Sequence, residues 1–167
     1  MQAISESALT FRPDPATSAQ RAGIVPYKMD ANGKVYWLMG RTHSGFLTDF
    51  GGGCKTRFHE SPVDCALREL REELGYVSYD LIREIEFNLF NPRKTAIYQG
   101  QPARPGSEVR RYIFYVNISV PWDVVRDFRP TDEIASIQWV DPTSITQNTK
   151  INSSIVEWLV YWRRFLM

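Results

Sequence analysis

The sequence predicts a single α/β domain. Three observations lead to this prediction: a length of 167 residues, several short apolar or alternating stretches typical of strands, and one amphipathic helical stretch at 62–74. An apolar content of 43% and a charged content of 23% are ordinary for a globular chain and argue against wholesale disorder. Residues 1–20, rich in Ser, Thr, Ala and Pro, are expected to form a loosely ordered arm, and residues 21–167 the domain.

The domain is expected to open with a β-hairpin. A strand starts near Arg21 with RAGIVPY, where Pro26 suggests a sheet edge or a bulge. The stretch DANG at 30–33 predicts the turn, because Asn-Gly tolerates the positive φ angles that hairpin turns need. VYWLMGR at 35–41 returns as the partner strand.

A glycine-rich loop, TDFGGGCKTRFHE, is expected to lead into the helix at 62–74. The ends of this helix carry residues that are common at helix ends. They are Ser61 as N-cap, Pro62 in the first position, Asp64 in an S-x-x-D capping pattern, and Gly75 as the stop.

Three further strands are predicted after the helix: REIEFNLF at 83–90, RRYIFYVNISV at 110–120 and ASIQWV at 135–140. The segment 91–108 between the first two is long for a hairpin connection and is expected to be a functional loop. The aliphatic and aromatic residues of 151–167 suit a packed C-terminal helix.

Net charge and cysteine content restrict the class of protein. A formal net charge of +1 gives no general attraction to nucleic acid or membrane, so any attraction must come from local patches. Cys54 and Cys65 are too few for a disulfide framework, which favours a reducing compartment. No stretch has the apolar run of a signal peptide or membrane helix. We therefore expect a cytoplasmic protein without a membrane partner.

The helix at 62–74 carries an unusual acidic face. Its apolar residues form one stripe: Val63, Ala66, Leu67, Leu70 and Leu74. Glu69, Glu72 and Glu73 gather about a third of a turn away. Like charges at these spacings repel, so this face is either merely solvated or binds a cation. Carboxylate clusters suit hard cations, here Mg²⁺ or Mn²⁺.

The residues around this face resemble the Nudix family. Seven residues after Glu60 the chain reads Arg-Glu-Leu-Arg-Glu-Glu-Leu-Gly-Tyr, at 68–76. The family signature is Gly, five residues, Glu, seven residues, then Arg-Glu-aliphatic-x-Glu-Glu-x-Gly-aliphatic. The chain departs from it in two places: six residues separate Gly53 from Glu60, and Tyr76 occupies the last aliphatic position.

The resemblance implies an α/β/α sandwich with a mixed sheet and a metal-dependent hydrolase of phosphoanhydride bonds. The expected substrate is nucleoside diphosphate-linked: a nucleoside polyphosphate, a dinucleoside polyphosphate or the cap of an mRNA. Glu69 and Glu73 would be metal ligands together with the carbonyl of Gly53. Glu72 would be a ligand or the catalytic base, and Glu133 is the candidate for a downstream base.

Within this motif Arg68 is expected to pair with Glu60 and so to tie the glycine loop to the helix. Two alternatives stay open. One is a non-catalytic nucleotide- or RNA-binding module on the same fold, which the extra loop residue favours; the other is an inositol pyrophosphate phosphohydrolase. His43 and His59, which flank the loop, are expected to be surface residues.

Substrate contacts are predicted from the basic segment at 91–111, which has a single acid, Glu108. A cationic loop beside a metal cleft favours a highly charged substrate, including capped RNA. The candidate contacts are Arg93, Lys94, Arg104, Arg110 and Arg111, with Tyr98 as a stacking platform for a base. The equally weighted alternative is a solvated loop.

Overall fold

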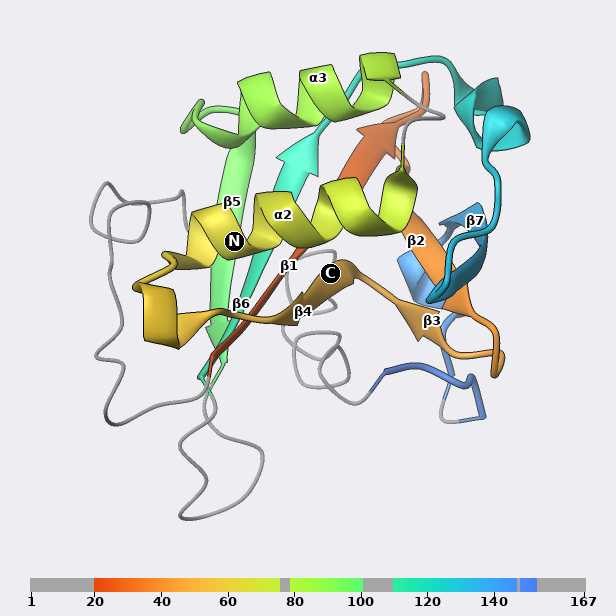
Figure 1. The fold of residues 1–167 in the computed structure, drawn as a ribbon. Helices are drawn as coiled ribbons and strands as arrows, with labels where there is room; N and C mark the ends of the chain where they lie inside the picture. Colours follow the sequence, from red (N-terminus) through yellow and green to blue (C-terminus); the bar gives the residue numbers. More distant parts are fainter. Residues whose placement is uncertain (1–19, 76–78, 101–109, 147, 153–167) are drawn as a thin grey trace.

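A computed structural model describes residues 20–75, 79–100, 110–146 and 148–152 (Figure 1). Its strands are β1 (Gln20–Met29), β2 (Val35–Thr42), β3 (Leu47–Thr48), β4 (Phe50–Gly53), β5 (Thr95–Gly100), β6 (Arg110–Asn117) and β7 (Ile134–Val140). Its helices are α2 (Pro62–Leu74) and α3 (Tyr79–Leu89), with short 3-10 turns η1 (Thr56–Phe58), η2 (Trp122–Asp127) and η3 (Pro142–Ser144).

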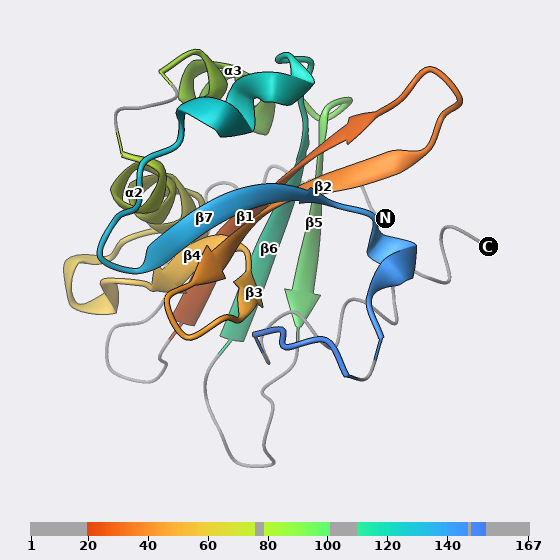
Figure 2. The same cartoon turned by 90° about the vertical axis from the view of Figure 1, so that its right-hand side faces the viewer.

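The seven strands form one mixed sheet, which confirms the predicted fold class. The order is β3-β2-β1-β6-β5, with β4 paired to β1 and β7 paired to β2. The β1–β6 pair is parallel and the other pairs are antiparallel. Figures 1 and 2 show α2 and α3 together on one face of this sheet.

Pro26 is expected at a sheet edge or a bulge, and the edge alternative is wrong, because β1 lies in the middle of the sheet. Residues Arg21–Ile24 pair with β4, and Tyr27–Met29 pair with β2. Pro26 therefore lies where β1 changes its antiparallel partner, a position that tolerates a missing N–H group. The hairpin turn at 30–33 is confirmed, with Gly33 at φ 81°.

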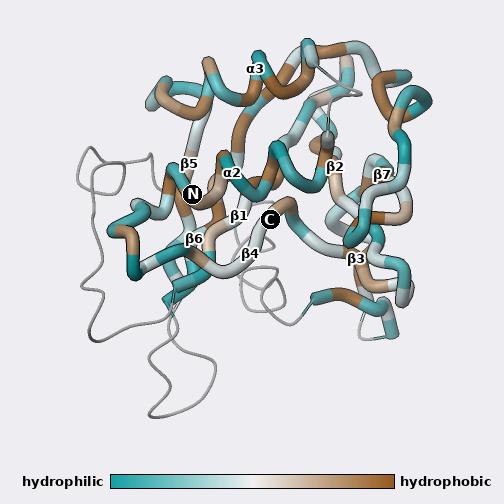
Figure 3. The backbone as a smooth tube through the Cα atoms, in the orientation of Figure 1, coloured by the Kyte–Doolittle hydropathy of each residue, from teal (hydrophilic) through white to brown (hydrophobic). Residues whose placement is uncertain are grey.

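Helix α2 has the predicted ends and the predicted buried stripe. The Ser61 hydroxyl accepts from the Asp64 amide at 3.2 Å, and Gly75 ends the helix with φ 63°. The whole apolar stripe is buried in the core between the helices and the sheet. A second cluster, which includes Val25, Trp37 and Tyr115, covers the other face of the sheet. Figure 3 shows hydrophilic and hydrophobic stretches alternating along both helices.

The strand expected at 83–90 is wrong, since these residues belong to α3. The buried side chains Leu81, Ile85 and Leu89 recur every fourth residue, which is the helical period. The sequence REIEFNLF also alternates, and the helical period becomes visible only when Leu81 is included.

The segments expected to be loops on either side of the helices contain strands. Within the expected loop at 91–108, β5 pairs with β6 from Thr95↔Val116 to Gly100↔Arg111. Within the glycine-rich stretch, β4 pairs closely with β1: a β-carbon on Gly51 would lie 2.5 Å from the Gly23 α-carbon. Only glycines permit this approach, so the glycine run is a strand and not an open loop.

The two cysteines form a disulfide, although their number is too small to indicate a disulfide framework. Cys54 follows β4 directly and Cys65 lies in the first turns of α2, with their α-carbons 5.2 Å apart. The cytoplasmic location stays a prediction. Among the described residues, no helix has the length and apolar character needed to cross a membrane. The expected arm at 1–20 lies outside the described residues except for Gln20, which begins β1. Most of the expected helix at 151–167 also lies outside them.

Candidate active site

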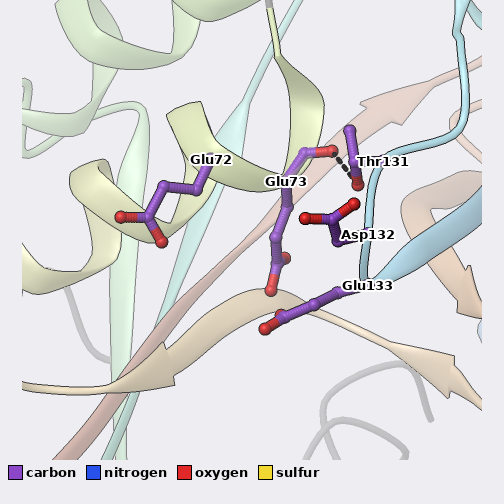
Figure 4. A pocket seen from close by; sticks show the side chains of 5 residues that line it. All are labelled: Glu72, Glu73, Thr131, Asp132 and Glu133. Atoms are coloured by element: carbon purple, nitrogen blue, oxygen red, sulfur yellow. Dashed lines mark hydrogen bonds between the residues drawn. The ribbon is translucent and has the colours of Figure 1, made fainter.

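Three carboxylates converge beside β4 (Phe50–Gly53), which is called the glycine strand below. Glu69 and Glu73 come from α2, and Glu133 comes from the segment that leads into β7. One oxygen of each lies within 4.8 Å of the other two. Glu69 and Glu73 are buried, with 8% and 4% exposure, whereas Glu133 is exposed. The cluster therefore consists of two buried carboxylates on α2 and one exposed carboxylate from another segment. Figure 4 shows the side chains of Glu73 and Glu133 directed toward the same point.

Repulsion and burial dominate the electrostatics of this cluster. Burial, together with the negative charges of Asp49, Glu69 and Glu133, raises the pKa of Glu73 to about 10. Burial also raises the pKa of Glu69, against the opposing effect of Arg68. A cation bound among these carboxylates would stabilise their ionised form and lower their pKa values. Because all the donors are hard oxygens, the residues fit Mg²⁺ or Mn²⁺.

The glycine strand lines the cluster with its backbone. The Gly51 amide donates to Glu73 Oε2 at 3.1 Å. A β-carbon on Gly52 would lie 2.6 Å from the Glu69 carboxyl carbon. The carbonyl of Gly53, predicted to face a metal, instead accepts from Arg68 Nη2 at 3.0 Å. Gly51 and Gly52 are thus the glycines that contact the cluster, and the metal role of Gly53 stays a prediction.

Arg68 connects the loop, the strand and the helix. Its Nε and Nη2 donate to the two carboxylate oxygens of Glu60 at 2.8 and 3.0 Å, and its Nη1 donates to Glu69 at 3.0 Å. The expected Arg68–Glu60 pair is therefore present. Although burial opposes it, the hydrogen bonds from Arg68 and the Lys55 amide hold the pKa of Glu60 below its usual value.

Glu72 lies apart from the other motif carboxylates. Its side chain is 56% exposed and contacts Arg68 Nη1 at 3.3 Å. Figure 4 shows it directed away from Glu73 and Glu133. Glu72 nevertheless lines a cavity of about 420 Å³ that two members of the cluster also line. The other lining residues are Glu73, Thr131, Asp132 and Glu133. Sequence reasoning missed Thr131 and Asp132, which have no periodic pattern around them.

A buried ion pair beneath the site was also missed. Arg21 donates to both oxygens of Asp49, at 2.8 and 2.6 Å, and Asp49 is fully buried. Although burial opposes it, Asp49 holds the pKa of Arg21 above its usual value. A β-carbon on Gly23 would lie 1.8 Å from Asp49 Oδ2, so glycine is required there. The sequence signal that could have indicated this pair is an acid in the largely apolar stretch FLTDF, because a buried charge needs a partner.

The structure separates the predicted basic residues. Arg93 and Lys94 lie in the turn before β5, where the Lys94 carbonyl accepts from Asn117 at the end of β6. Arg110 and Arg111 lie at the start of β6. In the sheet, the backbone of Arg111 in β6 is paired with that of Arg21 in β1, which is paired with Gly53 in β4. The start of β6 is therefore the end of that strand nearer to the glycine strand.

Tyr98 is not brought to the site. Tyr98 is in β5 and packs against the cluster of Val25, Trp37 and Tyr115 on the face of the sheet away from α2. Arg104 lies outside the described residues. His43 is exposed, and its Nε2 lies 2.8 Å from the carbonyl of Thr131.

The fold is an α/β fold with a mixed sheet, and the site is a carboxylate cluster between a helix and a glycine strand. The family model of the NUDIX domain matches residues 19–159, and the chain belongs to this family. The family membership confirms the predicted class of enzyme, a hydrolase acting on phosphoanhydride bonds.

Solved structures with this fold include an Ap4A hydrolase of C. elegans in a binary complex. It is 17% identical with a TM-score of 0.55, covering 89% of this chain and 97% of its own. The Nudix hydrolase RenU of M. smegmatis is 13% identical with a TM-score of 0.56, covering 90% and 85%. The NUDIX domain of Shewanella oneidensis NrtR, in complex with ADP ribose, is 11% identical with a TM-score of 0.57, covering 98% and 100%. No curated protein sequence matches the chain significantly.

Proposed function

We propose that this protein hydrolyses a diphosphate bond in a nucleoside diphosphate-linked substrate, in a reaction that depends on Mg²⁺ or Mn²⁺. The candidates are a nucleoside polyphosphate, a dinucleoside polyphosphate and the cap of an mRNA. The observation that carries the proposal is the convergence of Glu69, Glu73 and Glu133 within 4.8 Å of one another, two of which, Glu73 and Glu133, line a cavity.

Each carboxylate has a proposed role. Glu69, Glu73 and Glu133 would hold the cation, with a backbone carbonyl of the glycine strand as a further donor. When bound, the cation supplies charge neutralisation on the diphosphate oxygens as the bond breaks. Glu72 lines the cavity outside the cluster, where it can orient a water molecule and take its proton as the oxygen attacks phosphorus. Glu133, the most exposed member of the cluster, is the alternative base.

Nucleotide-containing substrates are supported by fold relatives: one is an Ap4A hydrolase, and another binds ADP ribose. The presence of every acid of the motif favours catalysis over the alternative of a binding module. An inositol pyrophosphate remains a second candidate substrate, since the motif specifies the diphosphate chemistry and not the group attached to it.

The test is phosphate release from a panel of nucleoside polyphosphates, dinucleoside polyphosphates, inositol pyrophosphates and capped RNA, with and without Mg²⁺. We expect hydrolysis of at least one nucleotide member, abolished by a chelator. We expect Glu72→Gln to lower kcat by more than about tenfold, because Glu72 is the proposed base. The fold should stay intact, because the Glu72 side chain is 56% exposed. Glu86→Gln, on α3 and paired with Arg71, is the matched control and should keep full activity.

Two results would contradict parts of this proposal. A wild-type protein that binds nucleotide but hydrolyses no member of the panel would be a binding module. Unchanged kcat in Glu72→Gln, combined with a large loss in Glu133→Gln that persists at saturating Mn²⁺, would assign the base to Glu133.

A further inference from the structure

The short segment that carries Glu133 is fastened to helix α2 by one side chain. Thr131 Oγ1 donates to the main-chain carbonyl of Glu73 at 3.2 Å (Figure 4). The same oxygen accepts from the Ile134 amide at 3.3 Å, and the Thr131 amide donates to the Ile134 carbonyl at 2.9 Å. A threonine hydroxyl has one donor and two acceptor positions, so this hydroxyl links the helix to the first residue of β7.

The carbonyl that Thr131 contacts is suited to this link. Helix α2 ends at Leu74, so the carbonyl of Glu73 is among the last four, which have no partner within the helix. Glu73 thus meets the 131–133 segment twice: its backbone at Thr131 and its carboxylate at Glu133. A shift of this segment would change both distances together.

A second contact holds the segment from the other side. His43, in the turn after β2, donates from Nε2 to the Thr131 carbonyl at 2.8 Å. Glu133 itself precedes β7 and is exposed, so neither the strand pairing nor packing in the core fixes it. Its position opposite Glu69 and Glu73 depends on how its neighbours are held.

We propose that Thr131 is a positioning residue: its hydroxyl holds Glu133 in the carboxylate cluster by bridging the end of α2 and the start of β7. The inference rests on the proposed function, in which this cluster binds a divalent cation. Groups that orient metal ligands typically change metal affinity by about 10- to 100-fold when they are removed. Loss of the hydroxyl should therefore weaken the site without removing any ligand.

The test compares Thr131→Val, which keeps the branched shape without the hydroxyl, with Thr131→Ser, which keeps the hydroxyl. Mn²⁺ affinity is measured by calorimetry or electron paramagnetic resonance, without substrate. We expect the Kd for Mn²⁺ to rise about tenfold or more in Thr131→Val and to stay near the wild-type value in Thr131→Ser. Thr143→Val, which removes a hydroxyl that donates to Asp141, is the matched control and should leave Mn²⁺ binding unchanged.

A double-mutant cycle with Glu133→Gln separates positioning from a general effect on the fold. If Thr131 acts through Glu133, Thr131→Val should cause little further loss of Mn²⁺ affinity in the Glu133→Gln background. An equal loss in both backgrounds would overturn the inference, as would a wild-type protein that binds no Mn²⁺. Because this readout needs no turnover, a cycle of the expected form in a protein that hydrolyses nothing would support the positioning role while contradicting the proposed function.

Discussion

Gly52 lies directly against the carboxylate of Glu69: a β-carbon on Gly52 would be 2.6 Å from both the carboxyl carbon and Oε1. No side chain can be added at this position unless Glu69 moves. The next residue differs, since nothing lies within 4 Å of a β-carbon on Gly53. The two neighbouring glycines therefore form a matched pair for testing how the strand shapes the site.

We predict that Gly52→Ala lowers Mn²⁺ affinity and turnover by about tenfold or more, because displacement of Glu69 disturbs the ligand set. Gly53→Ala should change both much less, since its backbone carbonyl can still accept from Arg68. Calorimetric Mn²⁺ titration and initial rates on the best substrate check this. Equal effects of the two substitutions would show that contact with Glu69 is not the reason for the glycine.

The buried Arg21–Asp49 pair is expected to matter for stability. Asp49→Ala would leave the Arg21 guanidinium, whose side chain is only 15% exposed, without its acid. Removing one partner of a buried pair costs about 3–5 kcal/mol in the free energy of unfolding. Urea unfolding of both proteins measures this difference. Lys34→Ala, which breaks the exposed pair with Asp141, is the control and should have little effect.

The Cys54–Cys65 disulfide closes a loop with a sequence separation of 11 residues, and the loop includes Glu60. Such a crosslink limits the unfolded chain, and its reduction to two thiols should lower the free energy of unfolding by about 3 kcal/mol. Thermal unfolding with and without a dithiol reductant tests this. The Cys54→Ser variant should unfold identically in both conditions. A wild-type Tm that is insensitive to the reductant would mean that the disulfide contributes nothing.

Local spacing explains which parts of the site could be predicted from the sequence. Glu69 and Glu73 are one helical turn apart, so the capped helix alone places them on one face. Glu133 could be predicted as a site residue only from the resemblance to the Nudix family, because no pattern in the neighbouring sequence indicates a contact with α2. The Arg21–Asp49 pair and the contact of Thr131 with Glu73 depend on long-range packing that leaves no periodic signal.

The errors in the fold have similar causes. The segment at 83–90 fits both strand and helix periods, and only its upstream neighbour Leu81 decides between them. The strand β5 is short and partly polar, and its pairing with β6 determines its structure more than its own residues do. Because β5 separates Arg93 and Lys94 from the start of β6, the apparent single basic loop becomes two separate groups.

This separation gives the last prediction, which concerns substrate phosphates. Arg110 and Arg111 begin β6 two strands from Gly53, whereas Arg93 and Lys94 lie at the other end of that strand. We expect replacement of Arg110 and Arg111 by Gln to raise KM for capped RNA or a dinucleoside polyphosphate more than for a simple nucleoside diphosphate derivative. The kcat should change little, because the carboxylates are untouched.

The same replacement should make RNA binding less dependent on salt, with a slope that falls by roughly 0.7 for each phosphate that is no longer neutralised. The double substitution of Arg93 and Lys94 by Ala is the matched control, with the same change in charge at the distant end of β6, and KM should stay near the wild-type value. Steady-state kinetics at several salt concentrations measure both variants. A larger rise in KM for the Arg93 and Lys94 variant would mean that the substrate extends along α3 instead, and an unchanged KM in both would make the two groups solvated surface.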